Sequence, residues 1–223
     1  MAKTVGAWCM STSARDDFSC DYAKVLTIHD TTENSISKSM RHHTLLNRAQ
    51  TALLIIDIQD RVHAVMRYRE AVETNTLKLI RGCQLLHVPI LLTEQYPKGL
   101  GHTISSIRNA LQATLPLQKM TFSCCGSADL MTVLQEKNIR QVAVVGIETH
   151  VCVLQTTLDL LASQYQVHVG RDAVSSRHEL DHQTALQRLQ QEGAIITTAE
   201  AILFELMERA DAAEFKEVSK LIK

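Results

Sequence analysis

VAVVGIETHVCVLQ, residues 142–155, joins a strand pattern to a helix pattern through a single cysteine. The apolar run 142–145 ends at Gly146, and an amphipathic helical pattern begins at Val153. Cys152 lies between them, where the positive end of the helix dipole favours the reactive thiolate. The alternative is a small buried hydrophobic residue, which is what most free cysteines are.

Similar apolar runs recur along the chain and predict the other strands of a sheet. They are continuous rather than alternating, which is typical of parallel strands buried on both faces. Helical patterns lie between them, at 69–86, 127–137 and 201–207. The order predicts one α/β domain, a three-layer α/β/α, Rossmann-like fold with a parallel sheet of about six strands. The expected strands are 52–58, 88–93, 117–122 (the weakest), 141–147, 166–169 and 194–198.

The composition excludes several classes of protein. The chain has 223 residues, 45% of them hydrophobic and 21% charged, with a formal net charge of −1. This hydrophobic content suffices for a core, and neither a basic excess nor a bilayer-length apolar run is present. We therefore expect neither nucleic acid nor membrane as a partner. The six cysteines form no regular framework and predict reduced thiols in a cytoplasmic protein.

The first 39 residues differ from the remainder. They are rich in Ser and Thr, show no sustained hydrophobic period, and have too many acidic residues for a mitochondrial presequence. Residues 1–10 lack the apolar stretch of a secretory signal. We predict a disordered extension over 1–39 and a folded domain over 40–223.

Chemically active residues follow several of the expected strands. Parallel sheets bind ligands at the carboxyl ends of their strands, so these residues should converge. Asp57 ends the first run, Lys119 lies in the weak third strand, and Cys152 follows the fourth. A structural Asp, a surface lysine and a buried thiol are the alternatives for each one alone. Together they supply a base, a cation and a nucleophile, which is the set needed for acyl transfer through a thioester.

At these residues the chain resembles the isochorismatase-like cysteine hydrolase superfamily. The matching segments are LLIIDIQ with Asp57, KMTFSC with Lys119 and GIETHVC with Cys152. The loop TEQYPKGLG (93–101) and the segment DAVSSR (172–177) are most similar to the isochorismatase-domain-containing proteins. The resemblance covers about residues 50–223.

The resemblance implies a metal-independent hydrolase that cleaves a C–N bond of a small amide. Cys152 would be the nucleophile, Asp57 the proton acceptor and donor, and Lys119 the cation beside them. A non-proline cis peptide would lie at 147–148, and backbone N–H groups of Glu148 and Cys152 would form the oxyanion hole. Neither metal nor organic cofactor is expected, and the protein should be a homo-oligomer, with association surfaces on the apolar helical segments 201–207 and 215–222. Expected substrate contacts are Gln59, Gln95, Tyr96, Phe122 and Thr149.

Three other functions compete with this interpretation. A non-catalytic binding or scaffold protein on the same fold would not need Cys152. A nicotinamidase would carry an Asp and two His residues for a metal after the second strand, whereas the loop 93–102 has only His102. The segment HELDH (178–182) matches the zinc-protease pattern H-E-x-x-H, but His182 shares a helical face with apolar residues and is expected to pack against the sheet.

Overall fold

A single six-stranded parallel sheet organises the chain. The computed structural model describes residues 41–111 and 114–223, and His42–Lys223 form one compact unit. The predicted extension over 1–39 lies outside the described residues. The strand order is β3-β2-β1-β4-β5-β6, with every pair parallel. The strands are β1 (Thr51–Ile56), β2 (Ile90–Gln95), β3 (Leu117–Lys119), β4 (Gln141–Ile147), β5 (Gln166–Ser175) and β6 (Ile195–Thr197).

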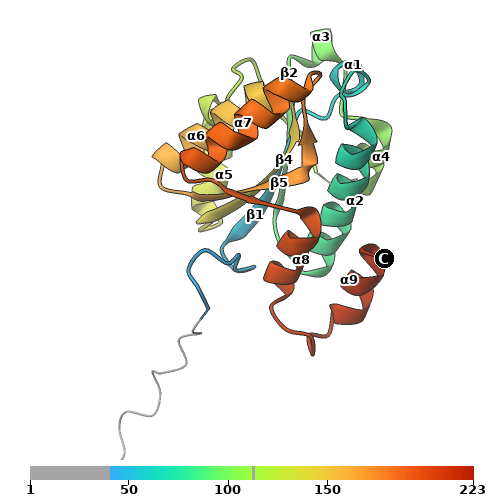
Figure 1. The fold of residues 1–223 in the computed structure, drawn as a ribbon, viewed down its shortest axis with the longest axis vertical. Helices are drawn as coiled ribbons and strands as arrows, with labels where there is room; N and C mark the ends of the chain where they lie inside the picture. The colour runs from blue at the N-terminus through green and yellow to red at the C-terminus, as the bar shows by residue number, and fades with distance from the viewer. Residues whose placement is uncertain (1–40, 112–113) are drawn as a thin grey trace, which may run out of the picture. The chain divides into compact units, whose positions relative to one another are not determined.

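Helices cover both faces of the sheet, which confirms the predicted three-layer α/β/α fold. Figure 1 shows α5, α6 and α7 on one face and α2, α4, α8 and α9 on the other. The short α1 and α3 lie near the carboxyl end of the sheet. The helices are α1 (Asp60–His63), α2 (Arg69–Leu85), α3 (Pro97–Leu100), α4 (Ser105–Ala110), α5 (Ala128–Glu136), α6 (Leu154–Ala162), α7 (Glu179–Gln191), α8 (Ala199–Met207) and α9 (Phe215–Leu221).

The continuous apolar runs are explained by the two cores that the sheet separates. In β1, Leu53 and Ile55 pack in one core, whereas Leu54 and Ile56 pack in the other. All six residues of β1 are buried, and so are all seven of β4. A strand with helices on both faces needs apolar residues at every position rather than at alternate ones.

The order of the strands creates a crevice at the carboxyl ends of β1 and β4. Strands β2 and β3 follow one another on one side of β1, and the chain then crosses over so that β4 lies on the other side of β1. In open α/β sheets, ligands bind where the strand order reverses in this way. Gly146 near the end of β4 has φ +123°, and a Cβ there would lie 2.1 Å from the carbonyl oxygen of Ile56. Only glycine permits this close approach of the two central strands.

Several local details differ from the sequence-based expectation. Strand β5 continues to Ser175, six residues beyond the expected end, and carries a register irregularity opposite Val144 and Gly146. The N-cap of α8 is Thr198, whose hydroxyl accepts from the N–H of Ala201, so this helix begins at Ala199, two residues before the expected start at 201.

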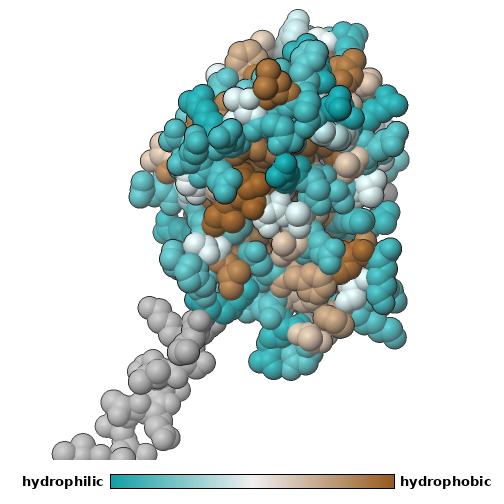
Figure 2. Space-filling model, in the orientation of Figure 1, coloured by the Kyte–Doolittle hydropathy of each residue, from teal (hydrophilic) through white to brown (hydrophobic). Residues whose placement is uncertain are grey.

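The C-terminal helices contribute to the core, which leaves few of their apolar side chains, among them Phe204 at 38% exposure, for the expected association surfaces. The apolar residues Ile202, Leu203 and Leu206 of α8 and Val218 of α9 are fully buried and pack in the core that contains α2. Figure 2 shows apolar residues on this face in separate patches among hydrophilic ones. Within residues 41–111 and 114–223, no helix has the length and apolar character needed to span a bilayer.

A buried histidine makes stability depend on pH. Burial lowers the pKa of His168 in β5 to about 4, although a hydrogen bond with the backbone of Thr44 acts to raise it. The imidazole of His168 binds a proton more readily in the unfolded chain than in the folded one. The free energy of unfolding is therefore highest above pH ~6.5 and falls by about 3 kcal/mol as the pH is lowered toward 4. Urea unfolding of the wild type and His168→Leu between pH 7 and pH 4 measures the difference in slope. Equal slopes for the two proteins would contradict the prediction.

Candidate active site

Asp57 and Lys119 form a buried ion pair at the carboxyl end of the sheet. Lys119 Nζ lies 2.6 Å from Asp57 Oδ2, and the two side chains are 1% and 5% exposed. The hydroxyl of Thr93, at the end of β2, donates to Asp57 Oδ1 over 2.7 Å. Asp57 has φ +51°, a left-handed conformation directly after β1. Both carboxylate oxygens are therefore engaged, and the Asp57 side chain has a fixed orientation.

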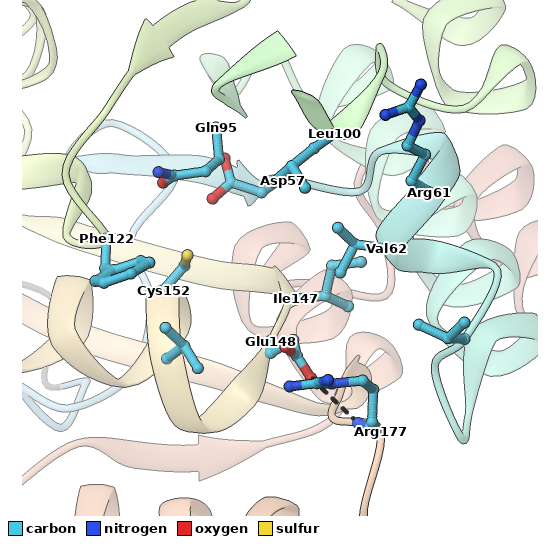
Figure 3. A pocket seen from close by; sticks show the side chains of 12 residues that line it. Asp57, Arg61, Val62, Gln95, Leu100, Phe122, Ile147, Glu148, Cys152 and Arg177 are labelled. Atoms are coloured by element: carbon cyan, nitrogen blue, oxygen red, sulfur yellow. Dashed lines mark hydrogen bonds and ion pairs between the residues drawn. The ribbon is translucent and has the colours of Figure 1, made fainter. Parts of the chain in front are cut away.

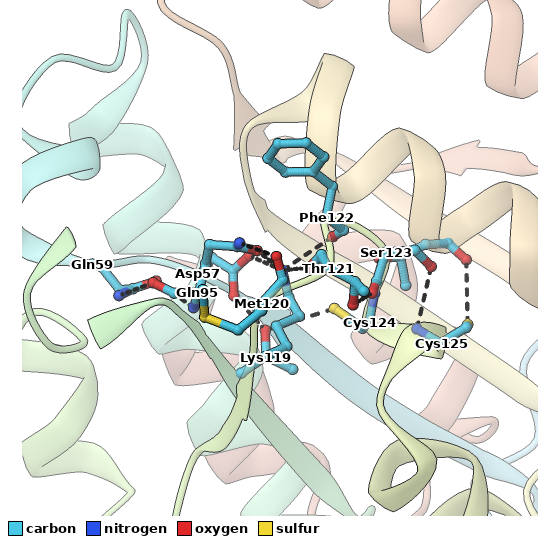
Figure 4. A network of polar contacts seen from close by, with 12 residues as sticks. Asp57, Gln59, Gln95, Lys119, Met120, Thr121, Phe122, Ser123, Cys124 and Cys125 are labelled. Atoms are coloured by element: carbon cyan, nitrogen blue, oxygen red, sulfur yellow. Dashed lines mark hydrogen bonds and ion pairs between the residues drawn. The ribbon is translucent and has the colours of Figure 1, made fainter. Parts of the chain in front are cut away.

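The Lys119 ammonium group is surrounded by acceptors, as Figure 4 shows. It donates to Gln95 Oε1 over 2.6 Å and to the carbonyl oxygens of Thr121 and Phe122 over 3.2 and 3.0 Å. Burial lowers the pKa of Lys119, but the negative charge of Asp57 and its hydrogen bond act in the opposite direction, and the net shift is upward. Lys119 is therefore a permanent cation, and the sequence-based alternative of a surface lysine is wrong.

The thiol of Cys152 faces this pair, and its protonation state differs from the sequence-based expectation. Burial, and after it the negative charge of Asp57, raise the pKa of Cys152 to about 12 against the opposing positive charge of Lys119. The thiol hydrogen-bonds to Asp57. The expectation that the helix dipole favours thiolate here is wrong, because an adjacent carboxylate and a buried position outweigh the dipole. The resting state of Cys152 is therefore a neutral thiol that is hydrogen-bonded to the Asp57 carboxylate.

Other cysteines do not compete for the role of nucleophile. Cys124 lies 3.7 Å from Thr93 Oγ1, but it is 1% exposed and does not line the pocket. Burial raises the pKa of Cys124 to about 12 and that of Cys83 to about 12. Cys83, Cys124, Cys125 and Cys152 are all free thiols, so the described cysteines include no disulfide. Cys152 alone among these four reaches the cavity.

The backbone before Cys152 contains the cis peptide that the resemblance implied, between Ile147 and Glu148. A single π-helical turn, η2 (Thr149–Val153), follows it and leads into α6. The carbonyl oxygen of Glu148 accepts from the N–H groups of Val151 and Val153 over 3.0 and 3.2 Å. Cys152 is thus part of a closed turn rather than of an extended loop.

Side chains of the segment 176–182 hold this turn in place. Arg177 Nε donates to Glu148 Oε2 over 3.1 Å, Thr149 Oγ1 lies 2.9 Å from His182 Nδ1, and His150 Nδ1 lies 2.9 Å from Ser176 Oγ. Three consecutive residues of the turn are therefore tied to one neighbouring segment. The arrangement positions the nucleophile through the residues that precede it.

The HELDH segment has a structural role in this arrangement. His178 is the N-cap residue of α7, and His182 is buried with its Nδ1 bonded to Thr149. Burial lowers the pKa of His182, so the ring is neutral. Within the described part of the chain, no group of three or more His, Cys, Asp or Glu residues is arranged to hold a metal ion.

Thr149→Val is expected to lower kcat by about 10- to 10²-fold with KM little changed, because small displacements of a reacting group carry costs of this order. The valine keeps the shape of the threonine, but it leaves His182 Nδ1 without its buried partner. Steady-state kinetics with any substrate of the enzyme measures the effect, and Thr149→Ser, which keeps the hydroxyl, is the matched control. A Thr149→Val enzyme with unchanged kcat would show that this bond does not position Cys152.

A cavity of about 320 Å³ opens over the thiol. Figure 3 shows Cys152 and Phe122 on one side of it and Arg61 and Val62 on the other. This volume is at the lower end of the range for small-molecule pockets. The cavity is lined by Asp57, Arg61, Val62, Val65, Gln95, Leu100, Phe122, Ile147, Glu148, Val151, Cys152 and Arg177.

Two of the five expected substrate contacts line this cavity, and three do not. Gln95 and Phe122 are in the wall. Thr149 is fully buried against His182, and Tyr96 turns its ring toward Gly99. Gln59 is also fully buried, because its amide bonds the backbone of Gln95 and the carbonyl oxygen of Gly101.

The loop over the cavity is held by two buried polar side chains, Glu94, which sequence reasoning did not single out, and Gln59, which it expected to contact substrate. Glu94 accepts from the N–H and hydroxyl of Thr103 over 2.7 and 2.8 Å, and Gln59 bonds the same loop at Gly101. These contacts fix Leu100 in the wall of the cavity. The cavity residues Arg61 and Arg177 were also missed, although Arg177 ends the DAVSSR segment that narrowed the resemblance.

Comparison with known proteins finds one family model and several relatives. The family model described as Isochorismatase domain matches residues 51–201. Isochorismatase family protein 1B of Dictyostelium discoideum is 41% identical over 177 residues, covering 78% of this chain and 86% of that protein. Isochorismatase domain-containing protein 2 of Bos taurus is 38% identical, covering 77% and 82%. The structure of MAR1 ribonuclease from Caenorhabditis elegans has a TM-score of 0.76 and 41% identity, covering 80% of this chain and 92% of that one.

Proposed function

The chain belongs to the isochorismatase family, and from that premise we propose that it is a cysteine hydrolase that cleaves the carbon–nitrogen bond of a small amide. The observation that carries the proposal is the meeting of Cys152, Asp57 and Lys119 beside one small cavity at the point where the strand order reverses. A thiol, a base bonded to it and a fixed cation are the groups needed for acyl transfer through a thioester.

The first half of the reaction forms the thioester. Cys152 Sγ attacks the amide carbonyl carbon while its proton moves to Asp57, which already accepts a hydrogen bond from the thiol. The carbonyl oxygen becomes an oxyanion, and the backbone N–H groups of Glu148 and Cys152 are the proposed donors to it. The carbon–nitrogen bond then breaks, and the amine leaves with the proton that Asp57 returns.

The second half of the reaction releases the acid. Water attacks the thioester carbon and gives one proton to Asp57, the carbon–sulfur bond breaks, and the Cys152 sulfur takes that proton back. Lys119 remains protonated throughout and holds the Asp57 carboxyl group in place from a distance of 2.6 Å. No step needs a metal or an organic cofactor.

A covalent adduct on Cys152 is the test of this proposal. The protein is incubated with a panel of small primary amides, quenched in acid within a turnover and analysed by intact mass and peptide mapping. We expect a mass increase equal to the acyl group on the peptide that contains Cys152, together with release of ammonia. The Cys152→Ser protein should show neither a thioester nor turnover, whereas Cys125→Ser should retain both.

An RNA oligonucleotide belongs in the same screen, because the C. elegans relative is named a ribonuclease. The cavity that carries Cys152 is mostly apolar and holds about 320 Å³, which suits a small amide better than a polynucleotide strand. Cleavage of RNA that is lost in Cys152→Ser, with no amide hydrolysed, would overturn the amide proposal.

We also propose that the protein is a cytoplasmic homo-oligomer. Large apolar side chains are exposed at the carboxyl end of the sheet, among them Val65 (58%), Met120 (71%) and Phe122 (54%). Val65 and Phe122 line the cavity, and exposed apolar surface of this kind typically marks an interaction site. Light scattering coupled to size exclusion measures the mass in solution, and a mass equal to 24.9 kDa at all concentrations would contradict the proposal.

A further inference from the structure

The charged side chains around the cavity do not balance one another. Asp57 is paired with Lys119, and Glu148 is paired with Arg177, which uses both its backbone N–H and its Nε for this contact. Arg61 is different. Its guanidinium donates to the carbonyl oxygen of Gly99, and no ion pair found among the described residues involves it. One positive charge at the cavity therefore lacks a carboxylate partner.

The region between Arg61 and the thiol is apolar. Val62, Leu100, Ile147 and Val151 contribute hydrocarbon surface to the wall, and Phe122 adds an aromatic ring beside Cys152. Polar groups other than those already paired are few along this path. A ligand that spans the cavity would therefore have a nonpolar body.

Arg61 lines this cavity on the side away from the thiol, where its side chain is exposed to solvent. It lies on the short helix α1, which follows β1 directly after Asp57 and Gln59. Its bond to Gly99 ties it to the loop that also carries Leu100. Figure 3 places Arg61 across the cavity from Cys152 and Phe122. A guanidinium has five donors in a rigid fork, so one bond to a carbonyl leaves donors for a carboxylate.

We propose that the substrate is a small amide whose other end is a carboxylate, with a short nonpolar chain between them. The carboxylate binds Arg61, the chain lies along the apolar wall, and the amide carbonyl reaches Cys152 Sγ. This inference rests on the proposed function for the position of the amide, but the carboxylate site itself depends only on Arg61 and the wall. Arg61 is the residue that determines specificity.

The first experiment compares two amides that differ only in the charged end. 4-Carbamoylbutanoate carries a carboxylate, and pentanamide is the neutral compound of similar length. Hydrogen bonds to a charged group contribute about 1.5–3 kcal/mol, which corresponds to roughly 10- to 10²-fold in kcat/KM in favour of the acid. In Arg61→Gln this preference should fall toward one, mainly through a higher KM for the acid. Lys98→Gln removes an exposed charge from the same loop without touching the cavity and should keep the preference.

A binding measurement separates this inference from the proposed function. Pentanoate, which has a carboxylate and no amide, is titrated into the wild type and Arg61→Gln by calorimetry. We expect about 10-fold or more weaker binding to the variant, whatever the outcome with amides. Equal binding by the two proteins, or no binding by the wild type, overturns the carboxylate site. Pentanoate binding that depends on Arg61, with no amide hydrolysed, would support the carboxylate site and contradict the proposed amide hydrolysis.

Discussion

Asp57→Asn is expected to slow amide hydrolysis by about 10²- to 10⁴-fold, because general acid–base catalysis typically contributes a rate factor of this size. The same substitution is expected to speed alkylation of Cys152 at pH 7. The two effects have opposite signs for one reason. The negative charge of Asp57 raises the pKa of Cys152, so removing it leaves Lys119 to favour the thiolate. The variant has a more reactive sulfur but no group to carry the proton to the leaving amine.

Two measurements on the same proteins test both effects. Iodoacetamide labelling followed by peptide mapping gives the alkylation rate of Cys152 as a function of pH, and ammonia release gives hydrolysis. In the wild type, labelling should rise above the pH of ~8.5 at which an ordinary thiol titrates, not below it. Asp60→Asn, which changes an exposed carboxylate three residues away, should alter neither rate. Faster labelling in the wild type than in Asp57→Asn would contradict the assigned roles.

Lys119→Met is expected to destabilise the protein by about 3–5 kcal/mol, which is the usual cost of breaking a buried ion pair by removing one partner. The change leaves the Asp57 carboxylate at 4% exposure, with the hydroxyl of Thr93 as its remaining donor besides the thiol. Urea unfolding at pH 7 measures the loss, and hydrolysis should fall as well because the Asp57 carboxylate would lose the cation that holds it in place.

The double variant Asp57→Asn/Lys119→Met distinguishes the contribution of the ion pair to stability from the contribution of side-chain packing. If the loss comes from an unpaired buried carboxylate, removing that carboxylate should restore part of the stability, and the two changes should be strongly non-additive. Lys98→Met, at an exposed position, should change stability by no more than about 0.5 kcal/mol. A fully additive double variant would show that Lys119 stabilises the protein independently of Asp57.

The fold was predictable because its signals are local. Continuous apolar runs predicted β1, β2, β4 and β6 to within two residues at each end, and they predicted the start of β5. The sixth strand, β3, was marked only by a weak pattern because it has three residues at the edge of the sheet. The end of β5 was missed because Gly170, Arg171 and Asp172 interrupt its apolar character while the backbone pairing continues.

The candidate site was predictable in its residue types but not in its electrostatics. Asp57, Lys119 and Cys152 could be brought together by the rule that strand ends share one edge of a parallel sheet. The pKa of Cys152 could not be predicted, because it depends on which charge lies nearest the sulfur. The nearest charge is set by contacts across three strands. Thr149 and Gln59 were misplaced for the same reason, since a polar side chain near a site can face the protein interior as readily as the ligand.

Gly146 has a consequence for attempts to change the substrate of this enzyme. The backbone of β4 lies so close to β1 that the sheet leaves no room for a side chain, and these two strands carry Cys152 and Asp57 at their ends. Randomising the strands would therefore damage catalysis before it altered selectivity. The walls that come from other elements, namely Val62 on α1, Leu100 at the end of α3 and Phe122 after β3, offer the positions for a focused library. Directed evolution of selectivity should begin there and leave the strands unchanged.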